Sequence, residues 1–168
     1  MFELFIGFWW EESWVFCLLL KSGYGKIECY VGGEQRKEAL RGADFVVNAI
    51  QVGLYDPCTI IDFEVPKKYG LRQTIGDTLG IGGIMRALRT IPVMKGFAED
   101  MEEVCPNALF LNYVNPMAML TGYMLRYTNV KTVGLCHSVQ VCSGHLLGML
   151  GMQDKLEGRK ELIAGINH

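Results

Sequence analysis

One stretch near the middle of the chain limits the folds that this sequence can adopt. Two short apolar runs, Ala108–Leu111 and Thr132–Leu135, have the length and composition of buried strands. Between them, Met117–Tyr127 is long and apolar enough to form a helix that crosses from one strand to the next. The order strand, helix, strand predicts a β-α-β unit and, with it, an α/β fold built on a parallel sheet.

Polar side chains follow both predicted strands at the point where each strand ends. In open parallel sheets the ligand crevice lies outside the carboxyl ends of the strands. Amide, thiol and imidazole groups gathered at such an edge make a candidate site, and the residues concerned are Asn112, Asn115, Cys136, His137 and Ser138.

Asp44–Ile50 is the clearest buried strand elsewhere, because it is a β-branched apolar run with one polar residue, Asn48. A lone asparagine in such a strand usually satisfies local backbone groups, but near the carboxyl end it can equally face a ligand. The remaining predicted elements are strands over Lys26–Val31 and Glu161–Ile166 and helices over Gln35–Arg41, Ile84–Arg89, Lys95–Val104 and Ser143–Leu150.

The composition indicates one globular unit with reduced thiols. A chain of 168 residues with 50% hydrophobic residues can bury a core. A net charge of −2 does not favour a nucleic-acid partner or an anionic membrane surface. Because the six cysteines are spread thinly rather than clustered as in secreted disulfide frameworks, we expect a cytoplasmic protein.

The first 21 residues are predicted to be an atypical leader. Glu11 and Glu12 divide an apolar segment into two short runs, whereas a membrane-spanning helix needs roughly 20 consecutive apolar residues. Glu3 stands where a signal peptide would have a basic start. The segment shows neither a typical strand nor a glycine-rich phosphate loop, and the glycines of Ser22–Gly33 do not fit a dinucleotide fingerprint.

Four glycines close together form a second candidate feature. Gly76, Gly80, Gly82 and Gly83 surround Asp77 and precede a predicted helix. Backbone N–H groups in such a segment can approach an anion or a sugar closely. The same composition is equally typical of an ordinary flexible loop, and the sequence leaves both alternatives open.

The cysteines and histidines after the second strand allow several kinds of site. Cys136, His137, Cys142 and His145 are accepted zinc ligands, but they lack the C-x-x-C spacing of a zinc knuckle. Cys136 as a nucleophile with His137 as its base is disfavoured, because neighbours in an extended segment project in opposite directions. Two further alternatives are a metal held by Cys136 and His168, and a Cys136 that is a buried apolar residue. Chemistry alone ranks packing first and the metal second.

Several strings of the sequence resemble one known enzyme family. They run in order from about Ser22 to His168: QRKEAL, RGADFVVNAIQVG, DFEVPKKYGL, QTIGDTLGIGGIMRALRTIP, DMEEVCP, LNYVNPMAM, VGLCHSVQ and AGINH. They are similar to strings of the NAD- and manganese-dependent glycoside hydrolases of family 4, and most of all to its bacterial α-galactosidases. The resemblance implies a partial Rossmann-like sheet with flanking helices, like that of lactate and malate dehydrogenases. It also implies a homo-oligomer that acts on a small-molecule glycoside.

The resemblance further implies roles for individual residues. The metal ligands fall on Cys136 of GLCHS and His168 of AGINH, and the sugar-binding asparagine falls on Asn115 of the NPM string. His137 lies where family members contact the substrate and can protonate the leaving oxygen. Asp77 matches an acid on the substrate side, with a catalytic role.

The family's reaction departs from the two-carboxylate scheme of most glycosidases. The resemblance implies that NAD+ oxidises the sugar at C3 and that the C2 proton is then lost with help from Mn2+. The bond between C1 and oxygen breaks by elimination, after which water adds and the hydride returns. Asn48 and Asn115 match positions on the cofactor side of this site.

Two parts of the family pattern have no matching string here, so the sequence predicts a fragment. These parts are the phosphate loop after a first strand and the later segment that supplies a catalytic base. We expect an atypical leader over 1–21, a partial NAD-binding domain over 22–135 and the start of a metal and substrate domain over 136–168. The isolated chain is expected to be inactive. The alternatives are a non-catalytic remnant that binds sugar or metal, and a structural zinc-binding α/β domain.

Overall fold

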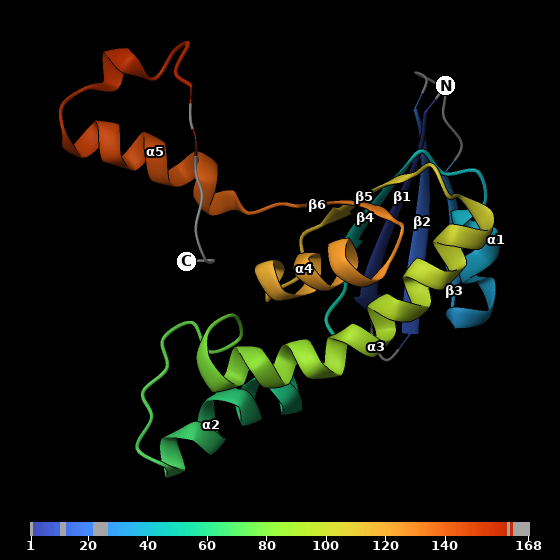
Figure 1. The fold of residues 1–168 in the computed structure, drawn as a ribbon, viewed down its shortest axis with the longest axis horizontal. Coiled ribbons are helices and arrows are strands. Elements are labelled where there is room, and N and C mark those ends of the chain that lie inside the picture. Colours follow the sequence, from blue (N-terminus) through green and yellow to red (C-terminus); the bar gives the residue numbers. More distant parts are fainter. Residues whose placement is uncertain (1, 11–12, 22–26, 161, 163–168) are drawn as a thin grey trace.

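The protein is built on one six-stranded sheet with helices packed against it (Figure 1). A computed structural model describes residues 2–10, 13–21, 27–160 and 162. The strands, in chain order, are β1 Phe2–Trp10, β2 Ser13–Lys21, β3 Ile27–Val31, β4 Phe45–Ala49, β5 Leu109–Asn112 and β6 Lys131–Gly134. The predicted β-α-β unit is confirmed as β5, α4 and β6.

The strands lie in the order β3-β2-β1-β4-β5-β6 across the sheet. β1, β4, β5 and β6 are parallel, whereas β2 runs antiparallel to both of its neighbours. Apart from the direction of β2, this order is that of the doubly wound dinucleotide-binding fold. The predicted α/β, Rossmann-like class is therefore confirmed.

The expectation that residues 1–21 contain no strand is wrong. β1 lies between β2 and β4, in the middle of the sheet, and pairs in parallel with β4 from Leu4 opposite Phe45 to Phe8 opposite Ala49. Two apolar runs of nine residues have the length of strands, and a pair joined by two residues can form a hairpin. Comparison with membrane and signal templates alone does not reveal this possibility.

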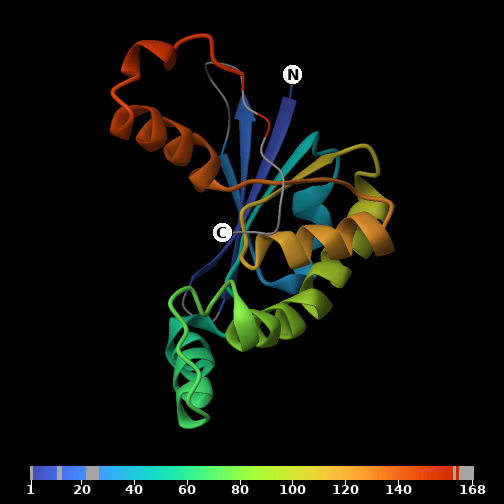
Figure 2. The same ribbon diagram turned by 60° about the vertical axis from the view of Figure 1, so that its left-hand side comes forward.

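The helical segments, in chain order, are η1 Gly33–Gln35, α1 Arg36–Leu40, η2 Leu54–Thr59, α2 Ile60–Lys68, α3 Gly80–Val104, α4 Met117–Tyr127, α5 His137–Met149 and η3 Gln153–Lys155. Within the described residues, no helix has both the length and the apolar character needed to cross a membrane. α3 packs against α1 and α4, and the three lie on the same side of the sheet (Figure 1). α5 leaves the end of β6 and stands apart from these helices in both views (Figure 2).

α3 is one helix of 25 residues where the sequence predicts two, Ile84–Arg89 and Lys95–Val104. A proline inside a helix removes one backbone hydrogen bond and commonly kinks or ends it. Pro92 is exposed, however, and buried residues on both sides of it, among them Thr90 and Met94, belong to one continuous stripe. The stripe packs against the sheet and against α1 and α4, and this packing keeps the chain helical on both sides of Pro92.

The core lies between the sheet and this helix layer. β4 and β5 alternate between buried and partly buried residues, so Val46 and Phe110 point into the core. Facing them, α3 contributes Met94 and Met101, and α4 contributes Leu120, all at most 1% exposed. The core thus fixes α3 and α4 relative to the carboxyl ends of β4 and β5.

Other boundaries differ from the predictions by a few residues. The helix predicted over Ser143–Leu150 begins earlier, at His137, and the predicted loop Gln51–Pro57 overlaps the π-helical turn η2. The helix predicted over Gln35–Arg41 is confirmed as α1, and Gly42 follows it with a φ of 76°. Of the strand predicted over Glu161–Ile166, the structure describes Leu162 alone, which is exposed and not in a strand.

Candidate functional site

Two buried asparagines lie side by side at the carboxyl ends of β4 and β5. Asn48 is the register partner of Asn112, and the two residues are 2% and 0% exposed. Asn48 Nδ2 donates a hydrogen bond to Asn112 Oδ1 over 3.0 Å. Both side chains lie on the helix-covered face, because they alternate in step with Val46 and Phe110. This pair joins two neighbouring strands where a ligand crevice is expected.

The segment after β5 carries Asn115 to the beginning of α4. The backbone N–H of Tyr113 donates to the Asn48 carbonyl oxygen over 3.0 Å, which ties the segment to β4. Asn115 is partly buried, and its Oδ1 accepts a hydrogen bond from the backbone N–H of Met117 over 3.4 Å. In the described part of the chain the Asn115 Nδ2 group makes no hydrogen bond, so it can donate to a ligand.

β6 delivers Cys136 and His137 to the same edge. The backbone N–H of Leu135 donates to the Asn112 carbonyl oxygen over 2.9 Å, so the chain leaves β6 beside the end of β5. Cys136 is the partly buried N-cap of α5, and His137 is its exposed first residue. The prediction that both lie in an extended segment is therefore wrong, since the helix begins between them. The His137 ring lies 5.8 Å from the Tyr113 ring, centre to centre.

The structure thus brings together five of the residues singled out from the sequence, and we call them the strand-end group: Asn48, Asn112, Asn115, Cys136 and His137.

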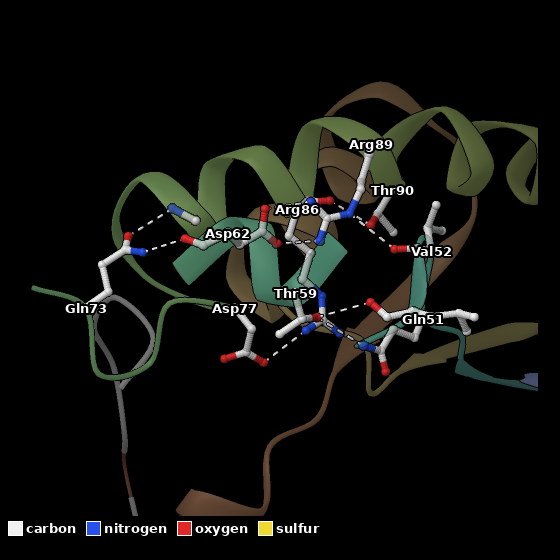
Figure 3. A network of polar contacts seen from close by, with 11 residues as sticks. Gln51, Val52, Thr59, Asp62, Gln73, Asp77, Arg86, Arg89 and Thr90 are labelled. Carbon is white, nitrogen blue, oxygen red and sulfur yellow. Dashed lines mark hydrogen bonds and ion pairs between the residues drawn. The ribbon is translucent and has the colours of Figure 1, made fainter. Parts of the chain in front are cut away.

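Asp77 belongs to a different part of the fold, the loop that precedes α3. Its Oδ2 accepts a 3.0 Å hydrogen bond from Arg86 Nη1, and this ion pair joins the loop to the helix (Figure 3). The Arg86 side chain is 10% exposed and that of Asp77 is 31% exposed. Burial lowers the pKa of Arg86, and the attraction of Asp77 opposes this effect. Among the described residues, Asp77 has no hydrogen bond to the strand-end group.

A second ion pair fixes the helices that carry this loop. Arg89 of α3 donates to both carboxylate oxygens of Asp62 in α2, and its Nε donates to the Val52 carbonyl oxygen over 3.2 Å (Figure 3). Gln73 adds a bridge, because its Nε2 donates to the Asp62 carbonyl oxygen and its Oε1 accepts from the backbone N–H of Gly82. The loop holding Asp77 is therefore attached to α2 and α3.

The glycine cluster serves close packing of this loop. A Cβ on Gly82 would lie 2.1 Å from the Gly76 carbonyl oxygen, and one on Gly83 would lie 2.4 Å from the Thr78 carbonyl oxygen. The backbone N–H groups of Gly82 and Gly83 are occupied by Gln73 and Leu79. The sequence left open an anion cradle and a flexible loop. Gly82 and Gly83 fit neither alternative, because their N–H groups are occupied and they are closely packed.

The zinc-cluster alternative finds no support in the described residues, where no group of three or more potential ligands is gathered. Cys142 and His145 lie within α5, on a face that lines a surface cavity of about 410 Å³. Both residues lie further along α5 than His137, because the helix extends away from the end of β6. His168, the second predicted metal ligand, lies outside the described residues.

Sequence reasoning misses three relationships around these residues. It places Asn112 at the end of a strand but gives it no role, although a position two residues after Phe110 puts it on the buried face. It does not set Tyr113 beside His137, and it does not pair Arg86 with Asp77. For Arg86, a basic residue on the buried stripe of α3 is an available signal, because a buried guanidinium requires an acidic partner.

Comparison with known proteins points to one family. A family model described as family 4 glycosyl hydrolase matches residues 19–152. The α-galactosidase of Bacillus subtilis is 60% identical over 158 residues, which are 94% of this chain and 36% of that protein. The α-galactosidase of Rhizobium meliloti is 43% identical over 135 residues, 79% of this chain and 27% of that protein. The chain therefore spans about a third of the length of these relatives.

A solved structure shows the same fold. It is the 6-phospho-β-glucosidase of Thermotoga maritima with manganese, NAD+ and glucose-6-phosphate, which matches with a TM-score of 0.63. The match covers 71% of this chain and 28% of that one at 24% sequence identity. At this identity the likeness concerns the arrangement of helices and strands.

Proposed function

Since the chain belongs to family 4 of the glycosyl hydrolases, we propose that it forms part of a glycosidase that cleaves α-galactosides. The strand-end group carries this proposal, because its amides, thiol and imidazole all follow the carboxyl ends of the parallel strands β4, β5 and β6. The identity of 60% to an α-galactosidase supports a galactoside as the substrate. We further propose that the reaction takes place in the cytoplasm and that the complete protein is a homo-oligomer.

We propose NAD+ and Mn2+ as the cofactors. Two observations support the nicotinamide side of the dinucleotide: the Asn115 amide has donor capacity left, and Asn48 lies at the adjacent strand end. When bound, NAD+ supplies a hydride acceptor and Mn2+ supplies a Lewis acid for the sugar oxygens. Cys136 at the end of β6 and His168 would hold the metal, and thiol plus imidazole leave coordination positions open for substrate.

The pyrophosphate side of the dinucleotide is not matched by the described residues. In dinucleotide-binding folds a glycine-rich turn leads from the first strand into a helix, whose N-terminus binds the pyrophosphate. Here β1 pairs antiparallel with β2, and only residues 11 and 12 separate the two strands. We therefore assign only the nicotinamide side of the cofactor to residues of this chain.

The remaining roles follow from placement and chemistry. Asn115 would donate to the sugar or the nicotinamide through Nδ2, and His137, exposed at the start of α5, would give a proton to the leaving oxygen. Asp77 would accept a hydrogen bond from a sugar hydroxyl through Oδ1, because its Oδ2 is already bonded to Arg86.

A second candidate function is binding without turnover. The hairpin of β1 and β2, in place of a phosphate-binding turn, favours this alternative. A chain of this kind would retain affinity for metal or sugar through the strand-end group.

Hydrolysis of p-nitrophenyl α-galactoside by the purified chain, with NAD+, Mn2+ and a thiol reductant, tests the proposal. We expect any turnover to require both cofactors and to be absent with p-nitrophenyl β-galactoside. Hydrolysis that persists without NAD+ and Mn2+ would contradict the proposed chemistry. No turnover, together with Mn2+ binding by calorimetry, would favour the binding function.

A further inference from the structure

Asn112 uses every hydrogen-bonding position of its side-chain amide. Its Oδ1 accepts from Asn48 Nδ2 over 3.0 Å and from the backbone N–H of Val114 over 3.1 Å. Its Nδ2 donates to the Val114 carbonyl oxygen over 3.3 Å and to Thr121 Oγ1 over 3.2 Å. A primary amide offers two donors and two acceptor lone pairs, so all four positions are filled. The residue is 0% exposed.

The orientation of this amide is fixed by its neighbours. The Val114 N–H can only donate, so the atom facing it at 3.1 Å must be the amide oxygen of Asn112. A rotated amide would place its NH2 group against that N–H and would leave buried polar groups unpaired. One side chain therefore joins β4, the segment after β5, and α4.

We propose that Asn112 is the positioning residue that fixes the Asn115 segment against Asn48 and so sets the nicotinamide side of the site. This inference rests on the proposed function only where it concerns the cofactor. Asn115 directly follows Val114, whose N–H and C=O both bond to the Asn112 side chain. Thr121, which accepts the fourth hydrogen bond, belongs to the helix that begins just after Asn115. Without these bonds the Asn115 amide would lose its fixed direction.

Asn112→Leu tests this role, because leucine has the same number of side-chain heavy atoms and the same branching at Cγ but makes none of the four hydrogen bonds. Amide hydrogen exchange of Val114 and Asn115, followed by NMR, reports on the segment itself. Binding of nicotinamide mononucleotide, which lacks the adenine half, reports on the cofactor side. We expect exchange at Val114 to accelerate at least tenfold relative to core amides of β4, and the Kd for the nucleotide to rise about tenfold or more.

Two further variants separate positioning from loss of stability. Met101→Ala removes a side chain of α3 that is 1% exposed, so it should lower the free energy of unfolding. It should leave unchanged both the exchange rate of Val114 relative to core amides of β4 and the Kd for nicotinamide mononucleotide. Thr121→Val removes one of the four hydrogen bonds with little change of volume, so we expect a smaller effect of the same kind. This variant serves as the test if Asn112→Leu does not fold.

Each outcome decides the proposal. Unchanged relative exchange at Val114 in Asn112→Leu and Thr121→Val would overturn it, whatever the nucleotide does. Faster exchange with an unchanged Kd would overturn the link to the cofactor. If the unaltered chain binds no nucleotide, the cofactor assignment of the proposed function fails, and hydrogen exchange alone decides whether Asn112 fixes the segment.

Discussion

Arg89 of α3 contacts both carboxylate oxygens of Asp62 in α2, through Nη1 at 2.9 Å and Nη2 at 2.5 Å. Asp62 is 5% exposed, and the same guanidinium donates to the Val52 carbonyl oxygen after β4. Hydrogen bonding of the guanidinium to the Asp62 carboxylate raises the pKa of Arg89. A single side chain thus holds α2, α3 and the segment after β4 in one arrangement.

Replacing Arg89 with methionine is expected to lower the free energy of unfolding by about 3 kcal/mol, because it leaves the buried Asp62 carboxylate without its partner. Urea unfolding measures the change. Lys95→Met is the matched control, since Lys95 pairs with Glu99 on an exposed helix face and its loss should cost less than about 0.5 kcal/mol. Equal effects of the two substitutions would contradict the importance assigned to Arg89.

Gly82→Ala is expected to destabilise the protein by about 2 kcal/mol. The new methyl group would lie 2.1 Å from the Gly76 carbonyl oxygen and 2.8 Å from that of Asp62, so backbone has to move. Gly122→Ala in α4 meets nothing within 4 Å and should instead stabilise the protein by about 0.8 kcal/mol, because alanine favours the helix. Thermal or urea unfolding of both variants shows whether the signs differ.

Cys105 should make the protein less stable in alkaline solution. Burial raises the pKa of its thiol from 9.0 to about 11. Between these values the folded chain keeps a proton that the unfolded chain releases, so the free energy of unfolding falls as pH rises through this window. Below about pH 9 the contribution is fully present, and its complete loss amounts to about 3 kcal/mol.

Urea unfolding from pH 8 to pH 11 measures the slope of the free energy of unfolding against pH. In Cys105→Ala the fall over the window should be shallower than in the unaltered chain, whereas Cys29→Ala, at an exposed thiol, should leave the slope unchanged. A slope that does not respond to Cys105→Ala would show that other groups cause it.

Mn2+ binding is expected to depend on the thiol of Cys136, the residue at the N-cap position of α5. Affinity should be weak, because the proposal gives the metal two side-chain ligands, and it should fall in Cys136→Ser and His168→Ala. Cys142→Ser and His145→Ala, within the helix, should bind as the unaltered chain does. Titration of these four variants by calorimetry tests the assignment, and Mn2+ binding retained by Cys136→Ser would remove the metal from this edge.

The β-α-β unit was predictable because its signal is local. Apolar runs of four residues separated by an apolar helix leave few arrangements, and β5, α4 and β6 fall within one residue of their predicted positions. Because neighbouring strands in such a unit are parallel, their carboxyl ends must share one edge. The order of residues along the chain is therefore enough to place Asn115 and Cys136 on the same edge of the sheet. Asn48 lies on that edge because β4 pairs in parallel with β5.

Tertiary structure decided what no local pattern contains. Whether two apolar runs form a leader or a hairpin depends on whether β4 offers an edge for β1 to pair with. Whether α3 continues past Pro92 depends on the packing of residues on both sides of the proline. Asn112, Arg86 and Arg89 bond to Asn48, Asp77 and Asp62, which lie 64, 9 and 27 residues away in the chain. Such contacts arise only when the whole sheet and helix layer are assembled, because burial then leaves each polar group with the partners that happen to face it.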